Sequence, residues 1–406
     1  LQAIYHLLGL DSITKKIAQK HKFMFDLNAI LSNLLYARIL FPSSKLAARQ
    51  RVKNFLEQPS FELQHVYRAL GVIAQESDLI QSELYKNSLK VADRNTHILY
   101  YDCTNFFFEI EQEEGLRQYG ISKEHRPSPI VQMGLFMDGD GIPLAFNISP
   151  GNTNEQVTLT HLEEKLLQDF KLSRLVVCTD AGLASTANRK FNDKKDRAFI
   201  TTQSIKKLKK SLKEWALDKT GWHIPGQKGS FDITKIDTDE ALAEAYKNTT
   251  FYKERWINEG GLEQRIVVTF SMKYKNYQRS IRYAQIERAI KTVEKNPQKI
   301  SKANQNDYKR FIAKKSITPE GEIADKNIYS IDAERIAKEQ AFDGYYAICT
   351  NLEDDAMHIL NLNKQRWEIE ESFRIMKSEF RSRPIYLSRD DRIRAHFTTC
   401  FLALTL

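Results

Sequence analysis

The chain has 406 residues and a formal net charge of +9, from 61 Lys and Arg against 52 Asp and Glu. A hydrophobic content of 42% with 28% charged residues is ordinary for a globular protein and argues against a wholly disordered chain. Because no apolar run reaches about 18 residues, the sequence also argues against a membrane-spanning helix, and its basic charge is compatible with a polyanionic partner such as nucleic acid.

Residues 1–93 are predicted to be helical. Asp26 is placed to cap one helix, and Ser44 to cap the next, Lys45–Leu56. Two further helices are predicted, at 62–74 and 77–92. We expect this N-terminal helical region to serve packing or DNA binding.

Strand patterns begin after residue 94. Runs of β-branched and aromatic residues between turn residues predict strands, and a helical period separates the later ones. The predicted order is β-β-β-α-β-α-β, with two antiparallel connections followed by parallel crossovers. The predicted strands are 97–110, 130–137, 142–148, 175–180 and 198–202. Residues 94–203 are therefore expected to form the first part of a mixed α/β core.

Residues 204–340 interrupt this pattern and are interpreted as a basic insertion domain. They contain two strand-like runs, 231–236 and 265–272, and a polar stretch, 275–315, that is rich in Lys and Arg. Near the start of the insertion, four lysines form a dense basic run, for which a solvated face is the default interpretation and a polyanionic partner the alternative: Lys206, Lys207, Lys209 and Lys210. A strand pattern at 345–351 resumes the core, which 341–406 is expected to complete.

Two aspartates lie in or at the end of the predicted core strands. Asp102 lies inside the first strand, in an apolar run where an unpartnered carboxylate is costly to bury. Asp180 ends the fourth strand, at the carboxyl edge where open α/β sheets place their sites. Taken singly, each aspartate is explained as a residue at a strand end that caps the following loop. If the first and fourth strands are neighbours, however, the two carboxylates lie side by side.

A third carboxylate, Glu370, lies on a predicted helix at 361–380. On a helical wheel it falls within about 40° of Arg366 and Lys377, so one acid lies between two bases. The stripe beside it is apolar and predicts packing against the core: Ile369, Phe373, Met376 and Phe380. An exposed ion-pair helix would show the same charge spacing. A core-facing helix would bring Glu370 to the two aspartates.

Three converging carboxylates repel one another unless a cation neutralises them. Oxygen ligands favour Mg²⁺ or Mn²⁺ over Zn²⁺, and the nine His residues show no zinc-site spacing. Two such ions suit an in-line displacement at phosphorus. We therefore predict a site for two Mg²⁺ (or Mn²⁺) ions held by Asp102, Asp180 and Glu370. Arg366 and Lys377 are predicted to contact DNA phosphates.

The residues around Glu370 resemble the DDE transposases of bacterial insertion sequences. One branch of that family carries a Y-x2-R-x3-E-x6-K signature around its catalytic glutamate. Arg366, Glu370 and Lys377 match this spacing. Asn363 stands at the tyrosine position and departs from the signature.

The two aspartate segments extend this resemblance. YYDCTNFFFE resembles the family's first-aspartate strand, with Asp102 in the catalytic place, and VVCTDAGLAS resembles the second-aspartate strand, with Asp180 in place. The resemblance covers roughly residues 95–406, with a weaker similarity in ARILFPSSKLA.

The resemblance implies a ribonuclease-H-like mixed sheet flanked by helices and interrupted by an α+β insertion. It also implies metal-dependent cleavage at insertion-sequence ends and strand transfer into target DNA. The catalytic residues would be Asp102, Asp180 and Glu370, and the DNA-binding residues would include Arg366, Lys377 and Asn363. The expected partner is double-stranded DNA, both transposon ends and target, bound by a homodimer. The expected location is the bacterial cytoplasm, associated with the nucleoid.

Two other functions remain open. A metal-dependent nuclease or resolvase on the same core would cut DNA without joining it, and a decayed derivative would bind DNA without catalysis. The four cysteines show no C-x-x-C spacing and are expected to be buried thiols in a reducing compartment. The first residue, Leu1, and the apolar helical end TTCFLALTL lead us to expect a fragment.

Overall fold

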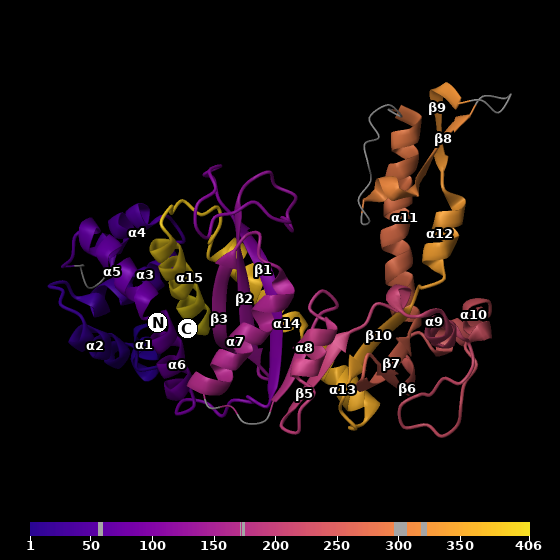
Figure 1. Cartoon of the computed structure of the whole chain (residues 1–406), viewed down its shortest axis with the longest axis horizontal. Helices are drawn as coiled ribbons and strands as arrows, with labels where there is room; N and C mark the ends of the chain where they lie inside the picture. Colours follow the sequence, from indigo (N-terminus) through magenta and orange to yellow (C-terminus); the bar gives the residue numbers. More distant parts are fainter. Residues whose placement is uncertain (56–59, 171, 173–174, 296–306, 318–322) are drawn as a thin grey trace. The chain divides into compact units, whose positions relative to one another are not determined.

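The structure is a computed structural model that divides into two compact units (Figure 1). It describes residues 1–55, 60–170, 172, 175–295, 307–317 and 323–406. The first unit comprises residues 1–202, 258–263 and 350–406, and the second comprises 203–257 and 264–349. Two predicted segments extend outside the described residues. They are the helix after Ser44, at Leu56, and the polar stretch, at 296–306. In the ranges described, no helix is long and apolar enough to cross a membrane.

The N-terminal part of the first unit is helical, as predicted. Its helices are α1 (Gln2–Leu7), α2 (Leu10–Lys20), α3 (Leu27–Leu40), α4 (Lys45–Arg51), α5 (Leu63–Gln75) and α6 (Ser77–Ser88). Asp26 caps α3 by accepting from the Ala29 N–H at 2.9 Å, and Ser44 caps α4 by accepting from Ala47 at 3.2 Å, so both predicted caps are confirmed. Helix α4 is shorter than predicted and continues as a 3₁₀ turn, η1 (Val52–Asn54).

The last helix, α15 (Asp390–Thr405), packs against α3 and α5 and joins the N-terminal helices to the core. The spacing of Ser388 and Asp391 in the sequence predicts a capping box at the start of this helix, but the two residues do not form one. The N-cap residue is Arg389, whose side chain makes no capping bond. The Asp391 carboxylate instead accepts from the Arg389 guanidinium at 2.7 Å.

The sheet of the first unit has the strand order β3-β2-β1-β4-β5. These strands are β1 (Ile98–Phe107), β2 (Ile130–Asp138), β3 (Pro143–Pro150), β4 (Leu175–Thr179) and β5 (Arg197–Thr202). The first three are antiparallel neighbours, whereas β1, β4 and β5 run parallel. Helices α7 (Glu155–Asp169) and α8 (Thr186–Phe191) precede β4 and β5, as the predicted order of elements along the chain requires. This mixed, helix-flanked sheet confirms the predicted ribonuclease-H-like fold class.

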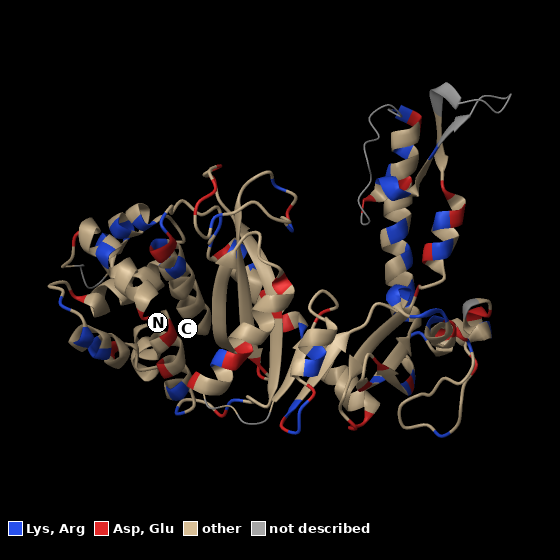
Figure 2. Ribbon diagram, viewed as in Figure 1, with Lys and Arg blue, Asp and Glu red and all other residues tan. Residues whose placement is uncertain are grey.

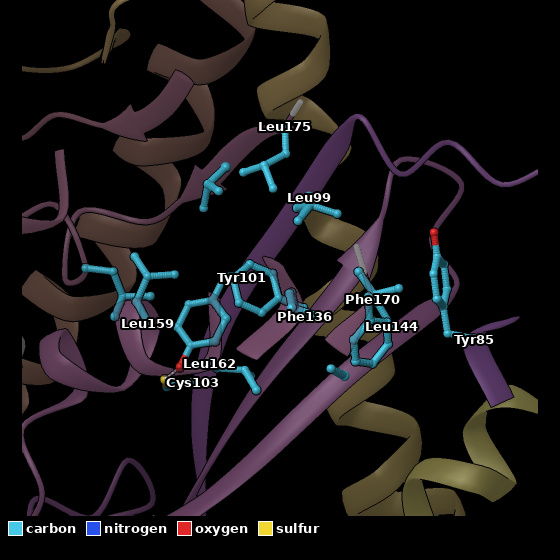
Figure 3. Close-up of a cluster of buried hydrophobic side chains, with 14 residues drawn as sticks. Tyr85, Leu99, Tyr101, Cys103, Phe136, Leu144, Leu159, Leu162, Phe170 and Leu175 are labelled. Carbon is cyan, nitrogen blue, oxygen red and sulfur yellow. Dashed lines mark hydrogen bonds between the residues drawn. The ribbon is translucent and has the colours of Figure 1, made fainter. Parts of the chain in front are cut away.

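One face of β1 packs into the core under α7 (Figure 3). Leu99, Tyr101 and Cys103 point to this face, together with Leu162 and Leu166 of α7. Because side chains alternate along a strand, the residues between them project from the opposite face. That opposite row is Tyr100, Asp102, Thr104 and Phe106. The predicted burial of the thiols is also confirmed, because Cys103, Cys178, Cys349 and Cys400 are free and buried.

The opposite face is covered by the C-terminal helical segment, which is not the single helix predicted at 361–380. It consists of α13 (Ala356–Lys364), α14 (Trp367–Arg374) and a π-helical turn, η6 (Ile375–Glu379). The chain turns at Gln365 and Arg366, and the Phe380 N–H donates to the Ile375 carbonyl, five residues back, at 2.9 Å. This widened turn shifts the later side chains, so one helical wheel does not describe the whole segment.

The second unit is mixed α/β. Strands β6 (Phe251–Glu259), β7 (Leu262–Phe270) and β10 (Tyr345–Thr350) lie in the order β10-β7-β6, and β8 (Ile312–Ile317) pairs with β9 (Ile323–Ile331). The helices and turns are η2 (Ile205–Lys207), α9 (Lys210–Leu217), η3 (Thr234–Asp237), α10 (Glu240–Ala245), α11 (Met272–Lys295), η5 (Tyr308–Phe311) and α12 (Ala333–Gln340). Figure 2 shows Lys and Arg recurring along α11.

The strands predicted at 265–272 and 345–351 are observed as β7 and β10. The second of them was expected to belong to the core, whereas nearly all of β10 lies in the second unit. The strand predicted at 231–236 is wrong. Its Asp232 side chain accepts from the Thr234 N–H at 2.7 Å, which starts a turn that continues into η3.

Candidate functional site

Asp102 and Asp180 are aligned on two adjacent parallel strands. In the pairing of β1 with β4, Tyr100 lies opposite Cys178. Each aspartate follows its member of this pair by two residues, so both lie at about the same level of the sheet, and the charge of Asp180 acts on Asp102. The condition on which the sequence hypothesis rested, that these two strands are neighbours, is met.

The surroundings of Asp102 disfavour its negative charge. Burial raises the pKa of Asp102 to about 6, and the charge of Asp180 adds to the rise. Lys123 and Arg366 act in the opposite direction, as does a hydrogen bond from the Cys103 N–H at 2.8 Å. The carboxylate therefore lies in a site that would gain stability from an additional positive charge.

Asp180 is held by the backbone that follows it. Its Oδ1 accepts from the N–H groups of Gly182 and Leu183 at 2.9 and 3.0 Å. A side chain at position 182 would approach this carboxylate, since a Cβ there would lie 3.3 Å from Oδ1. The two backbone hydrogen bonds thus fix one carboxylate oxygen of Asp180, and the absence of a side chain at Gly182 leaves space beside the carboxylate.

Glu370 lies on α14 and pairs with Arg366. The Arg366 Nη2 is 3.4 Å from the Glu370 Oε1, and the Glu370 side chain is 60% exposed against 18% for Arg366. Arg366 also acts on the strand residues, because its charge lowers the pKa of Asp102 and opposes the rise that burial causes at Cys178. In the part of the chain that the structure describes, no group of three or more Asp, Glu, His or Cys is arranged to hold a metal ion. The structure therefore aligns the two aspartates, whereas Glu370 is largely exposed and paired with Arg366.

Lys377 reaches the same face of β1 from the π-helical turn. Its Nζ donates to the Thr104 Oγ1 at 2.7 Å and lies 3.6 Å from the Glu124 carboxylate. Glu124 also pairs with Arg383. Burial lowers the pKa of Lys377 to about 8, and the charge of Lys123 contributes to this decrease. Lys377 is thus a partly desolvated base whose charge changes in the range of mildly alkaline solutions.

Lys123 and Glu124 are site residues that sequence reasoning missed. Lys123 donates to the Cys103 carbonyl and lies 3.2 Å from Glu155. Burial of its ammonium favours a lower pKa, but Asp102 and Glu155 outweigh this effect and raise it. Both residues come from the polar loop between β1 and β2, where no spacing pattern marked them. Only the return of this loop over β1 brings them to Asp102.

The other predicted DNA-binding residues occupy different environments. Asn363 is only 6% exposed on α13, so its side chain is not available to DNA in this conformation. In the second unit, the four lysines lie at η2 and at the start of α9, and all four are exposed: Lys206, Lys207, Lys209 and Lys210. Lys210 lies 4.0 Å from Glu214 of its own helix. Unlike Asn363, these four lysines have side chains that are accessible to DNA.

The donor chemistry of the aspartate pair suits a hard cation. Both residues supply only carboxylate oxygens, which Mg²⁺ and Mn²⁺ prefer. The raised pKa of Asp102 has the physical origin that a cation would relieve, namely burial beside a second acid. The residues present therefore fit such an ion at Asp102 and Asp180.

Comparison with known proteins identifies a family. A family model described as "Transposase DDE domain" matches residues 106–406. This range contains Asp180 and Glu370, whereas Asp102 lies just before its first residue. No protein with a curated description matches the chain.

Three solved structures are among those that resemble this chain. A piggyBac transposase synaptic complex with hairpin DNA has 8% identity and a TM-score of 0.45, covering 97% of this chain and 69% of that one. A Mos1 transposase paired-end complex with the left transposon end has 12% identity and a TM-score of 0.18, covering 42% and 57%. A Mos1 mariner paired-end complex with Mn has 13% identity and a TM-score of 0.18, covering 39% and 58%. At these values the likeness assigns no role to any residue of this chain.

Proposed function

Because this chain belongs to the transposase DDE domain family, we propose that its first unit cuts DNA at transposon ends and joins the freed ends to target DNA. Asp102, Asp180 and Glu370 are the proposed catalytic residues. The observation that carries the proposal is the alignment of Asp102 with Asp180 across β1 and β4. Two acids at one level of a parallel sheet edge form the arrangement expected for reaction at a phosphodiester.

Asp102 and Asp180 would hold the divalent cations, which we propose to be two Mg²⁺ or Mn²⁺ ions. Bound ions of this kind activate a water or a 3′-hydroxyl and stabilise the attacking and leaving oxygens. The family uses divalent metals, and the count of two ions is part of the proposal. Support comes from the oxygen-only donors and from the raised pKa of Asp102.

Glu370 is the proposed third ligand, and Arg366 controls its availability. In the structure Arg366 pairs with the exposed Glu370 carboxylate, and its charge also lowers the pKa of Asp102. A phosphate can compete with Glu370 for Arg366, because the guanidinium can form two parallel hydrogen bonds with a phosphate, whereas its exposed pair with Glu370 is a 3.4 Å contact of little stability. We propose that a DNA phosphate takes Arg366 away from Glu370, which leaves Glu370 free to turn toward the aspartates.

Lys377 and Arg366 position the DNA backbone. Lys377 lies beside Thr104, two residues beyond Asp102 on the same face of β1, so a phosphate bound to it would lie close to the aspartates. Glu124 competes with DNA for Lys377, since the two side chains are 3.6 Å apart. DNA binding would therefore exchange ion pairs that exist within the protein for pairs with phosphates.

The proposed reaction has two displacements at phosphorus. In the first, a water oxygen bonds to the phosphorus at the transposon end, the bond to the 3′-oxygen breaks, and a 3′-hydroxyl and a 5′-phosphate result. In the second, this 3′-hydroxyl bonds to a target phosphorus and releases a target 3′-hydroxyl. Phosphodiester bonds are conserved in the second step, so no energy-rich cofactor is required.

The second unit would supply nonspecific affinity for double-stranded DNA. Its exposed lysines, Lys206, Lys207, Lys209 and Lys210, can each neutralise a backbone phosphate. The chain spans 57% to 69% of the solved transposases it resembles, so recognition of specific ends and assembly as a homodimer on DNA are proposals for the whole protein.

The test is a pair of DNA assays. Wild type, Asp102→Asn and the control Glu371→Gln are incubated with supercoiled plasmid and Mg²⁺ or Mn²⁺, and nicking is measured. A duplex with a pre-cut 3′-hydroxyl end is then offered with plasmid, and covalent joining is measured. We expect nicking and joining by wild type and the control, and neither by Asp102→Asn. Nicking without joining would identify a nuclease or resolvase, and no metal-dependent reaction by wild type would reject catalysis.

A further inference from the structure

A second basic site lies in the first unit, between helices α3 and α4 and the segment that precedes α15. It is a cavity of about 410 Å³. Its cationic lining residues are Arg38, Lys45, Arg51, Arg381 and Arg383. No Asp or Glu is among the described residues that line it. A pocket with several cations and no acid is suited to a negatively charged ligand.

Lys45 is the most informative residue of this pocket. It is only 6% exposed, and neither a hydrogen bond nor a carboxylate is among the causes that shift the pKa of its ammonium. Burial lowers the pKa of Lys45 to about 7, and the charge of Arg38 contributes to this decrease. A buried lysine without an anionic partner is costly to the protein, so its position calls for a partner that the described residues do not supply.

Arg38 gives the same indication independently. It is 5% exposed, and its Nη1 donates to the Phe380 carbonyl at 2.8 Å. Its Nε is buried and has no hydrogen-bond partner. Two neighbouring cations, both more than nine-tenths buried, therefore retain hydrogen-bonding capacity at this cavity. An anion bound there would satisfy both.

The pocket lies close to the candidate catalytic face. The segment that forms one of its walls is attached to the end of β1, since the Ile385 N–H donates to the Phe107 carbonyl at 3.0 Å. Arg383 of this wall pairs with Glu124, which lies 3.6 Å from Lys377. Cationic side chains thus continue from Lys377 through Arg383 into the cavity. This continuity favours a ligand with several phosphates in series.

We propose that this pocket binds a phosphate group of the DNA backbone, as an anchoring point separate from the carboxylates that would carry out the reaction. Its partner class, DNA, rests on the proposed function. Lys45 and Arg38 form the floor of the site, and Arg51 and Arg383 contribute from its walls. The pocket holds the DNA strand in place and takes no part in bond breaking.

The test is DNA binding without divalent metal, so that no reaction takes place. Lys45→Met removes the buried charge with little change in volume, and Arg51→Gln removes a charge from the exposed part of the wall. Lys53→Met is the matched control, because Lys53 is exposed, close in sequence and outside the pocket. Fluorescence anisotropy with a labelled duplex gives Kd as a function of salt.

We expect Lys45→Met and Arg51→Gln each to weaken binding several-fold. Each should lower the slope of log K against log salt by about 0.9, the value for one lost phosphate contact. Lys53→Met should leave the slope unchanged. If the slope of log K against log salt is the same in both pocket variants as in wild type, the proposal is overturned. Because Lys45 has no described partner, Lys45→Met should fold, and its thermal unfolding verifies this; Arg51→Gln tests the pocket independently.

Inorganic phosphate distinguishes the possible sources of the ligand. Thermal unfolding is measured with increasing phosphate at constant ionic strength. A phosphate-dependent rise in Tm that Lys45→Met loses, together with the altered DNA slope, supports a DNA-backbone site. The same rise with an unaltered DNA slope would mean a pocket for small phosphorylated molecules and would overturn the DNA assignment.

The outcome is separable from that of the proposed function. If wild type fails to cut or join DNA but the pocket variants lower the salt slope, the pocket stands and the catalytic proposal fails. If wild type cuts and joins DNA while the pocket variants bind as wild type does, the pocket proposal alone fails.

Discussion

Asp102 and Asp180 lie at one level of two parallel strands, because each follows the Tyr100–Cys178 pair by two residues. The two carboxylates come from positions far apart in the sequence, and the register of β1 with β4 alone brings them together. Burial and the neighbouring acid then raise the pKa of Asp102 to about 6. This relationship leads to the first two predictions.

The buried Asp102 should make the protein less stable as the pH rises. Its folded pKa of about 6 lies above its ordinary value of 3.8, so between these values the folded state binds more protons than the unfolded state. Stability therefore falls from about pH 4 to pH 6, by up to about 3 kcal/mol at neutral pH. Asp102→Asn should remove this loss. Urea unfolding of wild type and Asp102→Asn at pH 4.5 and 7 measures the free energy of unfolding. If the two proteins differ by the same free energy at both pH values, the prediction is wrong.

Magnesium should stabilise the protein more at pH 7.5 than at pH 5.5. Protons compete with a cation for Asp102 once the pH falls below its pKa of about 6. A ligand that binds only the folded state raises Tm. We expect Tm to rise with Mg²⁺ in wild type, less so at the lower pH, and not in Asp102→Asn. EDTA should reverse the rise. An equal rise in Asp102→Asn would place the ion elsewhere.

Glu370→Gln should strongly reduce DNA nicking without unfolding the protein. The Glu370 side chain is 60% exposed and its contact with Arg366 spans 3.4 Å, so loss of this pair should cost less than about 1 kcal/mol. We expect DNA nicking to fall by about a hundredfold or more, a typical loss for a group that stabilises transition-state charge. Glu371→Gln is the control, since Glu371 pairs with Arg374 on the same helix. Comparable nicking by the two variants would exclude Glu370 from catalysis.

Lys377 should make DNA affinity depend on pH near 8. Burial lowers its pKa to about 8, so its positive charge is present below that pH and lost above it. Affinity for duplex DNA should decrease between pH 7 and 9 in wild type. In Lys377→Arg the decrease should be smaller, because arginine keeps its charge throughout this range. Anisotropy titrations at both pH values measure this, and identical pH profiles would show that Lys377 does not contact DNA.

Gly134 and Gly71 should respond oppositely to alanine. A Cβ at Gly134 would lie 2.2 Å from the Tyr101 hydroxyl, which is held by Thr158 at 2.8 Å. Gly134→Ala should therefore destabilise the protein by about 1–3 kcal/mol. In helix α5, a Cβ at Gly71 would lie 3.7 Å from its nearest neighbour, so Gly71→Ala should stabilise by about 0.5–1 kcal/mol. Chemical unfolding checks both values. A neutral Gly134→Ala would show that the β1–β2 pair relaxes easily.

The periodic patterns of the sequence were sufficient to predict the sheet of the first unit. Continuous apolar runs such as LVVCTD predict buried strands, and the predicted succession of strands and helices along the chain is observed. That the first and fourth strands are neighbours came only from the pairing of β1 with β4. The helical wheel of 361–380 was less successful, because it assumed a constant period. The turn at Arg366 and the π-helical turn after Arg374 break that period, and neither has a clear local signal.

Local chemistry alone determined the elements: Asp26 and Ser44 cap their helices, and the strand runs of the core occupy the predicted places. Tertiary structure alone decided which side chains meet. It returned a loop to place Lys123 beside Asp102, paired Arg366 with Glu370, and enclosed Lys45 and Arg38 in one cavity. The physical reason is that caps and periodicity depend on residues a few positions apart, whereas burial and charge coupling depend on segments that the sequence does not place side by side.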